Sequence, residues 1–170
     1  GRVILSKDAP SGTAFTLLIA TRGLPLNAVA CFKPRPRFFS ARAVEKTMVI
    51  AIPSPAFKQW VLENADVAAC ILDTMGNLLD GAYTRILDLI DESVEQRILN
   101  ALNMLSLRIG PDLPMTNNDI ADMTGTSRET AARVISRLQE AGLIRKSRGH
   151  IEILNGLQLD GLSTSPIFIL

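Results

Sequence analysis

Residues 127–144, which read SRETAARVISRLQEAGLI, place charged side chains at a spacing suited to hydrogen bonding with a polar surface. Arg128, Glu129 and Arg133 fall on the polar side of a predicted helix whose other side is apolar. An arginine donates two parallel hydrogen bonds from its planar guanidinium, and a glutamate accepts them. These residues either form an ordinary solvated face or are arranged to read a charged partner, and the rest of the chain must distinguish the two.

The distribution of charge favours a charged partner, although the 170-residue chain has a formal net charge of only +1. Residues 127–150 contain six basic and two acidic side chains. Residues 63–95 contain eight acidic side chains and a single basic one, Arg85. This asymmetry predicts an anionic partner for the C-terminal part of the chain.

Helix-start and helix-end signals predict the elements that hold the charged side chains. Thr116 with Asp119 three residues later has the pattern of a capping box, which begins a short helix over residues 117–124. Gly125 follows its end, where a left-handed conformation is favoured. Residues 127–141 form a second, longer helix, capped at its start by a serine and followed by a glycine. Small and apolar residues face inward from the two helices: Ile120, Ala121, Met123, Ala131, Val134, Ile135 and Leu138.

A basic hairpin follows the second helix. Residues 143–145 and 151–154 alternate like two strands, with a turn at residues 147–149, and a short last helix is predicted over residues 156–162. A short helix, a glycine turn, a longer helix and a basic hairpin together predict a winged helix-turn-helix, which is a DNA-binding unit.

In such a unit the start of the second helix enters the major groove. Arg128 and Arg133 are each suited to guanine O6 and N7, and Glu129 to the amino group of cytosine. Hydroxyl groups and free amides at the helix start suit phosphates, and the basic wing suits the adjacent backbone. The candidate DNA-contacting residues are Thr116, Ser127, Arg128, Glu129, Thr130, Arg133, Arg145, Lys146 and Arg148. The single histidine, His150, is expected near a phosphate or simply exposed.

The N-terminal third is predicted to be mostly β. Residues 3–5, 15–20 and 47–52 read as strands, residues 7–12 as a turn, and residues 33–37 as a proline-containing loop. These strands are too few to close on themselves and would leave an exposed edge. Because the chain also opens at a glycine within a strand-like run, we expect the N-terminal part of a longer protein to be missing.

Helical periodicity begins near residue 55, and a long helix is predicted over residues 65–90. Its apolar stripe persists for more than three heptads, which is typical either of a dimer seam or of a helix packed on its own domain. The candidate dimerisation residues are Ile71, Met75, Leu78, Leu79, Ala82, Ile86 and Leu89. Asp91 or Ser93 caps the next helix, whose buried stripe is Val94, Ile98, Leu102 and Leu105. Residues 110–114 are predicted to be a loop.

Several classes of function find no support in the sequence. The two cysteines, Cys31 and Cys70, have no paired spacing, so neither a disulfide framework nor a metal site is expected, and a reducing cytoplasm is the default location. No uninterrupted apolar run reaches membrane-spanning length. One histidine, with no phosphate-binding glycine loop and no carboxylate cluster, offers no catalytic constellation, so an enzyme is not expected. A dimerising interaction or sensor module that does not bind DNA stays open as an alternative.

The string Ser127-Arg128-Glu129-Thr130-x-x-Arg133 resembles the recognition helix of bacterial regulators related to the cyclic-AMP receptor protein and the fumarate–nitrate reduction regulator, the CRP/FNR family. The likeness extends upstream through residues 94–98, 65–90 and 38–53. It implies an α+β fold. Residues 1–90 would be a partial β-roll, like a cyclic-nucleotide-binding jelly roll, with the long dimerisation helix at residues 65–90. Residues 91–162 would be the winged helix-turn-helix, and residues 163–170 a tail.

The resemblance also implies a homodimer on inverted TGTGA-like half-sites, gated by an effector in the β-roll and in contact with RNA polymerase. Cyclic-nucleotide binders of the family carry Gly-Glu and then Arg-Ser in the phosphate cassette. Here Asn27-Ala28 and Arg37-Phe38 stand at those positions, so only Arg37 is retained and cyclic AMP is not expected to bind tightly. The effector and any cofactor are unknown, and haem or redox ligands in the missing part stay open. Activation and repression are not distinguished.

Overall fold

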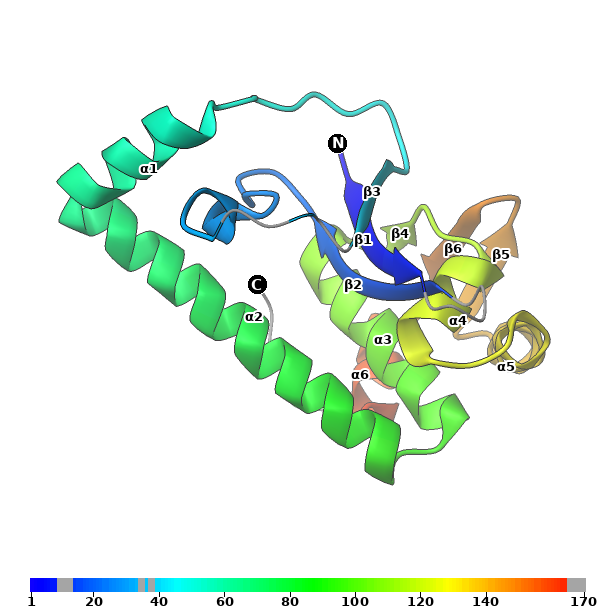
Figure 1. Cartoon of the computed structure of the whole chain (residues 1–170). Helices are drawn as coiled ribbons and strands as arrows, with labels where there is room; N and C mark the ends of the chain where they lie inside the picture. The colour runs from blue at the N-terminus through cyan, green and yellow to red at the C-terminus, as the bar shows by residue number, and fades with distance from the viewer. Residues whose placement is uncertain (9–13, 34–35, 37–38, 165–170) are drawn as a thin grey trace.

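The computed structural model describes residues 1–8, 14–33, 36 and 39–164, and it has the α+β architecture expected from the sequence (Figure 1). The elements in chain order are β1 Val3–Asp8, β2 Ala14–Ala20, η1 Ala28–Cys31, β3 Ser40–Ala43, α1 Ser54–Glu63, α2 Ala65–Asp91, α3 Val94–Ile109, β4 Asp112–Leu113, α4 Asn117–Thr124, α5 Arg128–Glu140, β5 Ile144–Ser147, β6 His150–Ile153 and α6 Gly156–Leu162. None of these helices is long and apolar enough to cross a membrane.

The N-terminal sheet has the order β2-β1-β3, and both pairings are antiparallel. The strands predicted at residues 3–5 and 15–20 are confirmed. The turn predicted over residues 7–12 is wrong at its start, because Lys7 and Asp8 still pair with β2. The rest of that turn lies outside the described residues.

The strand predicted over residues 47–52 is also wrong. This segment is extended but pairs with no strand in the described part of the chain, and Met48 and Ile50 are each at least 90% exposed. A strand needs a hydrogen-bonded neighbour, and β1 already has one on each side, β2 and β3. The free edge of β1 is thus taken by residues 40–43, which the apolar pattern did not single out.

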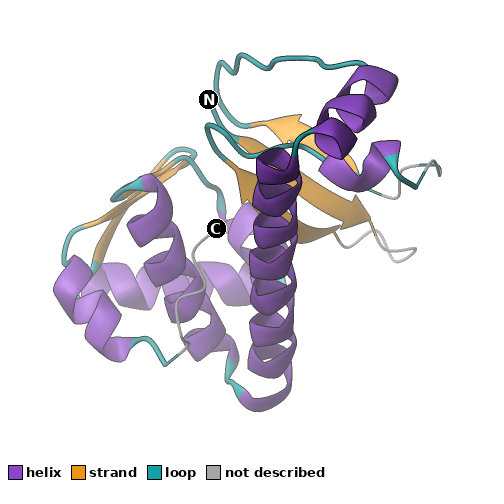
Figure 2. Ribbon diagram, turned by 90° about the vertical axis from the view of Figure 1, so that its left-hand side faces the viewer, coloured by secondary structure: helices purple, strands orange, loops and turns teal. Residues whose placement is uncertain are grey.

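The long helix α2 confirms the periodicity read over residues 65–90. It runs along the lower left edge of the molecule in Figure 1, and Figure 2 shows it in front of the C-terminal helices. Of the predicted dimerisation residues, Ile71, Met75 and Leu78 are half-buried on its inner side. The other predicted residues, Leu79, Ala82, Ile86 and Leu89, are exposed. Leu72, Tyr83 and Ile90 are exposed as well, so α2 has an apolar outer face that nothing in the described chain covers.

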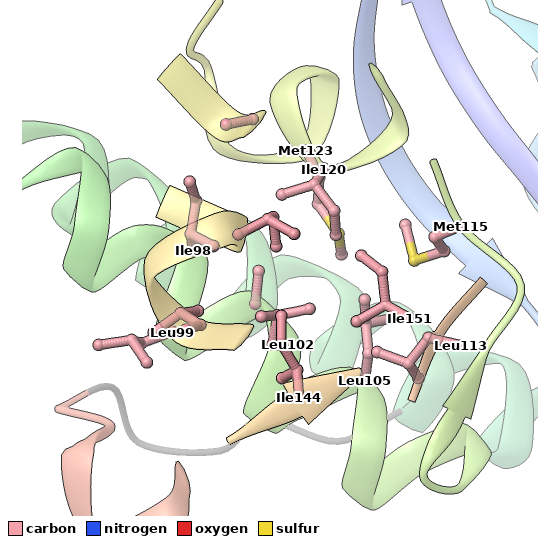
Figure 3. Close-up of a cluster of buried hydrophobic side chains, with 14 of the residues drawn as sticks. Ile98, Leu99, Leu102, Leu105, Leu113, Met115, Ile120, Met123, Ile144 and Ile151 are labelled. Carbon is pink, nitrogen blue, oxygen red and sulfur yellow. The ribbon is translucent and has the colours of Figure 1, made fainter. Parts of the chain in front are cut away.

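The C-terminal helices pack around one apolar core (Figure 3). Ser93, rather than Asp91, caps α3 by accepting a hydrogen bond from the amide of Gln96 at 3.2 Å. Ile98, Leu102 and Leu105 of the predicted α3 stripe are fully buried, while Val94 packs at the edge of the core. The predicted inward-facing residues of α4 and α5 are all buried as well: Ile120, Ala121, Met123, Ala131, Val134, Ile135 and Leu138.

The second sheet has the order β4-β6-β5, so the wing is three-stranded. The loop predicted over residues 110–114 is wrong in part, because Asp112 and Leu113 form β4 opposite Glu152 and Ile151. Two prolines and a glycine in residues 110–114 indicated a loop, but the buried side chain of Leu113 is held in the core by its pairing with β6.

The N-terminal sheet and the C-terminal helices share their interior. Ile4 of β1 and Ile19 of β2 belong to the same buried cluster as the residues of α3, α4 and α5. At the rim of this contact Arg42 of β3 forms an ion pair with the buried carboxylate of Asp119 on α4. Beside it, burial and the nearby carboxylate of Asp119 raise the pKa of Asp122 above its usual value. The sheet therefore rests directly on α4.

We predict that Thr116→Ala lowers the free energy of unfolding by about 1 kcal/mol. The Thr116 hydroxyl accepts a hydrogen bond from the backbone amide of Asp119 at 3.3 Å and donates one to the Asp119 carboxylate at 2.7 Å. Both of these bonds disappear in the variant, whereas the bond from the backbone amide of residue 116 to that carboxylate remains. This loss corresponds to a Tm decrease of about 2–4 °C in a domain of this size. Thr84→Ala is the matched control, because that hydroxyl donates to the carbonyl of Asp80 within its own helix. Equal effects of the two substitutions on Tm would contradict the prediction.

Candidate nucleic-acid interface

The turn between α4 and α5 fixes the direction of α5. Gly125 ends α4 in the left-handed region with φ of 64°, and the amide of Thr126 bonds to the carbonyl of Ala121 at 3.1 Å. Ser127 then caps α5 by accepting from the amide of Thr130 at 3.2 Å. A residue with a Cβ is strained in the left-handed region, so glycine is strongly favoured at this corner.

The polar face of α5 carries the residues singled out in the sequence. Arg128, Glu129 and Arg133 are all exposed, whereas Ala131 and Val134 on the opposite face are buried. Arg133 donates to the hydroxyl of Thr130 at 3.2 Å, which orients its guanidinium along the first turn of the helix. The pKa of Glu129 is lowered by a hydrogen bond from its own backbone amide and by Ser127, so this side chain is an ionised acceptor at neutral pH.

The wing places further cations beside this face. Arg145, Lys146 and Arg148 are exposed on β5 and the β5–β6 turn. Arg145 pairs with Glu152 at 3.0 Å, and the amide of Lys146 donates to the side chain of Gln139 on α5 at 3.0 Å. The Gln139 bond links the wing to α5. His150 is half-exposed and lies 3.3 Å from the carboxylate of Asp112, so it belongs to the wing as expected.

A groove runs beside α5, between its polar face and the start of α3. Ser93, Glu95, Thr130, Arg133 and Arg137 are among the residues that line it. Arg137 forms an ion pair with Glu95 across the groove at 3.0 Å, so α3 and α5 are linked there by charge. The sequence pattern counted Arg137 among the basic residues but did not indicate this pairing.

Two residues that the sequence reading did not assign to the site fix the end of α4. Arg97 of α3 donates to the carbonyl of Thr124 at 2.9 Å and to that of Glu92 at 2.9 Å. Leu89 of α2 packs on Gly125, where a Cβ would meet its Cδ2 at 2.9 Å. The sequence alone could not predict these contacts, because an arginine or a leucine is common on any amphipathic helix.

The weak effector-pocket candidate, Arg37, lies outside the described residues, as do the neighbouring residues 34, 35 and 38. Asn27 and Ala28, at the other position compared with the phosphate cassette, are described. Asn27 takes a left-handed conformation with φ of 65° at the start of η1, and Ala28 is buried. The two positions that the resemblance sets against Gly-Glu thus carry an amide and a buried methyl group, and neither carries a carboxylate.

The exposed cations, the capped α5 and the three-stranded wing define a winged helix-turn-helix protein of the DNA-binding class. Residues 96–162 match the family described as the Crp-like helix-turn-helix domain. The chain is 24% identical over 153 residues to a CRP-like cAMP-activated global transcriptional regulator of Mycobacterium tuberculosis, covering 85% of this chain and 68% of that protein.

Two further likenesses cover nearly the whole chain. The cyclic AMP receptor protein of Thermus thermophilus is 26% identical over 164 residues, which are 96% of this chain and 76% of that protein. The solved structure of a CRP/FNR-family transcriptional regulator from Thermus thermophilus has a TM-score of 0.75 at 26% identity, covering 96% of this chain and 84% of that one. The chain is thus similar over nearly its whole length to regulators of the CRP/FNR family, and it is a DNA-binding transcription regulator. The matched proteins are regulators rather than enzymes, and a module without DNA binding is not favoured.

We predict that Gly125→Ala destabilises the protein by more than Gly142→Ala. Both glycines have positive φ, of 64° and 73°, and a non-glycine residue there costs about 1–2 kcal/mol. Only Gly125 also meets a side chain, that of Leu89, whereas a Cβ on Gly142 meets nothing within 4 Å. The difference between the urea midpoints of Gly125→Ala and Gly142→Ala measures the cost of the contact between the new Cβ and Leu89. If that difference is the same in a Leu89→Ala background, the contact does not contribute to the destabilisation.

Proposed function

We propose that the chain is the DNA-reading part of a homodimeric, sequence-specific transcription regulator of inverted TGTGA-like sites. The observation that carries this proposal is the joint exposure of Arg128, Glu129 and Arg133 at the start of a capped helix, beside a basic wing. A solvated face needs no such wing, and the charge of the whole chain is close to zero.

Base reading and phosphate binding fall to different residues in this proposal. Arg128 and Arg133 donate to guanines and Glu129 accepts from a cytosine, each good pair contributing about 1–3 kcal/mol of discrimination. Thr116, Ser127 and Thr130 contact phosphates from the starts of α4 and α5. Arg145, Lys146 and Arg148 bind the neighbouring backbone and give a salt-dependent affinity that is indifferent to sequence.

The uncovered face of α2 supports the homodimer. Leu72, Leu79, Ile86 and Ile90 lie at separations of seven, seven and four residues along this face, and all are exposed. That spacing is the heptad pattern of a parallel helix pair. Burial against a second copy would remove the apolar face from water, with the exposed members of the predicted set, Leu79, Ala82, Ile86 and Leu89, in or beside the seam. Two reading helices would then meet successive major grooves about 34 Å apart.

The effector is proposed to be something other than cyclic AMP, although two of the matched relatives are named for that nucleotide. The ribose of a cyclic nucleotide needs a hydrogen-bond acceptor, and Ala28 supplies none. Such an effector would act by favouring one of two or more relative positions of α2 and α4 over the others. Contact with RNA polymerase and action on DNA in the bacterial cytoplasm complete the proposal.

Binding of duplex DNA tests the reading face. Fluorescence anisotropy with an inverted TGTGA duplex and a scrambled one, at two salt concentrations, should show a clear preference for the first. We predict that Arg133→Ala erases this preference, because it loses a bidentate base contact. Arg148→Ala, the matched wing control, should weaken both duplexes alike and reduce the salt slope by about one. A wild-type chain that binds both duplexes equally, as a dimer, would contradict the half-site assignment.

The mass of the protein in solution, measured by sedimentation equilibrium, tests the proposed dimer seam on α2. We predict that the wild-type chain has twice the mass of a single chain and that Ile86→Glu shifts it to the single-chain mass. In a two-fold symmetric seam the introduced carboxylate faces a copy of itself, and burying like charges is unfavourable. Asp73→Lys, on the exposed polar side of the same helix, is the matched control and should stay dimeric. A dimer that tolerates Ile86→Glu would place the interface elsewhere.

A further inference from the structure

Arg85 of α2 contacts both the N-terminal sheet and the helix-turn-helix. Its Nη1 donates to the carbonyl of Leu17 on β2 at 2.9 Å, and its Nη2 donates to the carbonyl of Met123 on α4 at 2.8 Å. The guanidinium also lies over the ring of Phe15 on β2, with its central carbon 4.5 Å from the ring centroid. One side chain thus joins three elements that are far apart in sequence.

The surroundings of Arg85 make these contacts strong. Burial lowers its pKa to about 10, and the nearby carboxylate of Asp88 opposes that shift, so the side chain stays cationic at neutral pH. A charged donor away from water is held firmly by the acceptors it meets. Arg85 is also the single cation in the acidic stretch of residues 63–95, so no neighbouring cation in that stretch offers a substitute.

The carbonyl that Arg85 holds lies at the end of α4, immediately before the corner that directs α5. The last carbonyls of a helix have no partner within the helix and need one from outside. Arg97 supplies one for Thr124, and Arg85 supplies one for Met123. The two arginines come from α3 and α2, so the end of α4 is fixed to the long helix and to its own domain at once.

We propose that Arg85 is a positioning residue for DNA binding, which locks the end of α4 to β2 and α2 and so fixes the direction in which α5 is presented. This inference rests on the proposed DNA-reading function. In the arrangement that Arg85 holds, the proposed reading residues Arg128 and Arg133 of α5 and the basic residues of the wing are exposed, so the described chain does not block them from DNA. Without the lock, α4 and α5 sample other directions, and the apparent affinity falls with the competent fraction. Because the same side chain also donates to β2, a displacement of the sheet would move the end of α4 and so change the direction of α5.

The test compares wild type, Arg85→Met, Arg85→Lys and Arg22→Met on the inverted and scrambled duplexes. Methionine keeps the aliphatic packing and removes both donors. We expect Arg85→Met to bind the inverted duplex about tenfold more weakly, within the range of measured couplings between sites. Its binding to the scrambled duplex should be nearly unchanged. Lysine, which keeps the charge but not the forked geometry, should restore part of the loss. Arg22 is exposed, so Arg22→Met should behave as wild type.

A double-mutant cycle with Phe15→Leu separates positioning from a loss of fold. Phe15 lies on β2, is not among the proposed DNA-contacting residues, and contacts the same guanidinium. We expect Phe15→Leu to weaken specific binding in the wild-type background and to have no further effect beside Arg85→Met. Independent, multiplicative effects of the two substitutions would overturn the inference. So would a folded Arg85→Met chain, judged by its Tm, with wild-type affinity for the inverted duplex. If the wild type itself shows no preference between duplexes, the proposed function fails instead.

Discussion

The left-handed corner at Gly125 is the constraint on which the proposed DNA-reading surface depends. It ends α4, lets Ser127 cap α5, and sets the direction in which the first turn of α5 points. Three contacts from two helices hold it: Leu89 of α2 on the glycine, Arg97 of α3 on Thr124 and Arg85 of α2 on Met123. A displacement of either helix therefore changes where the charged face of α5 is presented.

The shared core explains how a change in the N-terminal sheet can reach the DNA-reading helix. Ile4 and Ile19 lie in the same buried cluster as apolar residues of α4 and α5, and Arg42 forms an ion pair with the carboxylate of Asp119 at the start of α4. A close-packed interior transmits displacement instead of absorbing it. Because the sheet rests on α4, the proposed effector, acting on the sheet, would have a short physical path to both α5 and the proposed dimer seam on α2.

Much of this arrangement was predictable because it is encoded locally. The capping box at Thr116, the glycine at 125 and the 3.6-residue period of α2 each express backbone chemistry within a few residues. Strand pairing is not local, so the apolar run of residues 47–52 predicted a strand that pairs with none of the described strands, and the short β4 was read as a loop. Arg85 carried a visible signal as the lone cation of an acidic stretch, but its partners, Leu17 and Met123, follow only from the tertiary fold.

The most direct test of the account is protection of guanine N7 from methylation on a duplex with two inverted TGTGA-like half-sites. Arginines that read the major groove must cover N7, whereas contacts to the backbone alone leave it reactive. The account predicts protected guanines in two successive major grooves, about one helical turn apart, with one guanine in each half-site exposed again by Arg133→Ala. Tight binding of this duplex with unprotected guanines, or protection that Arg133→Ala leaves intact, would contradict it.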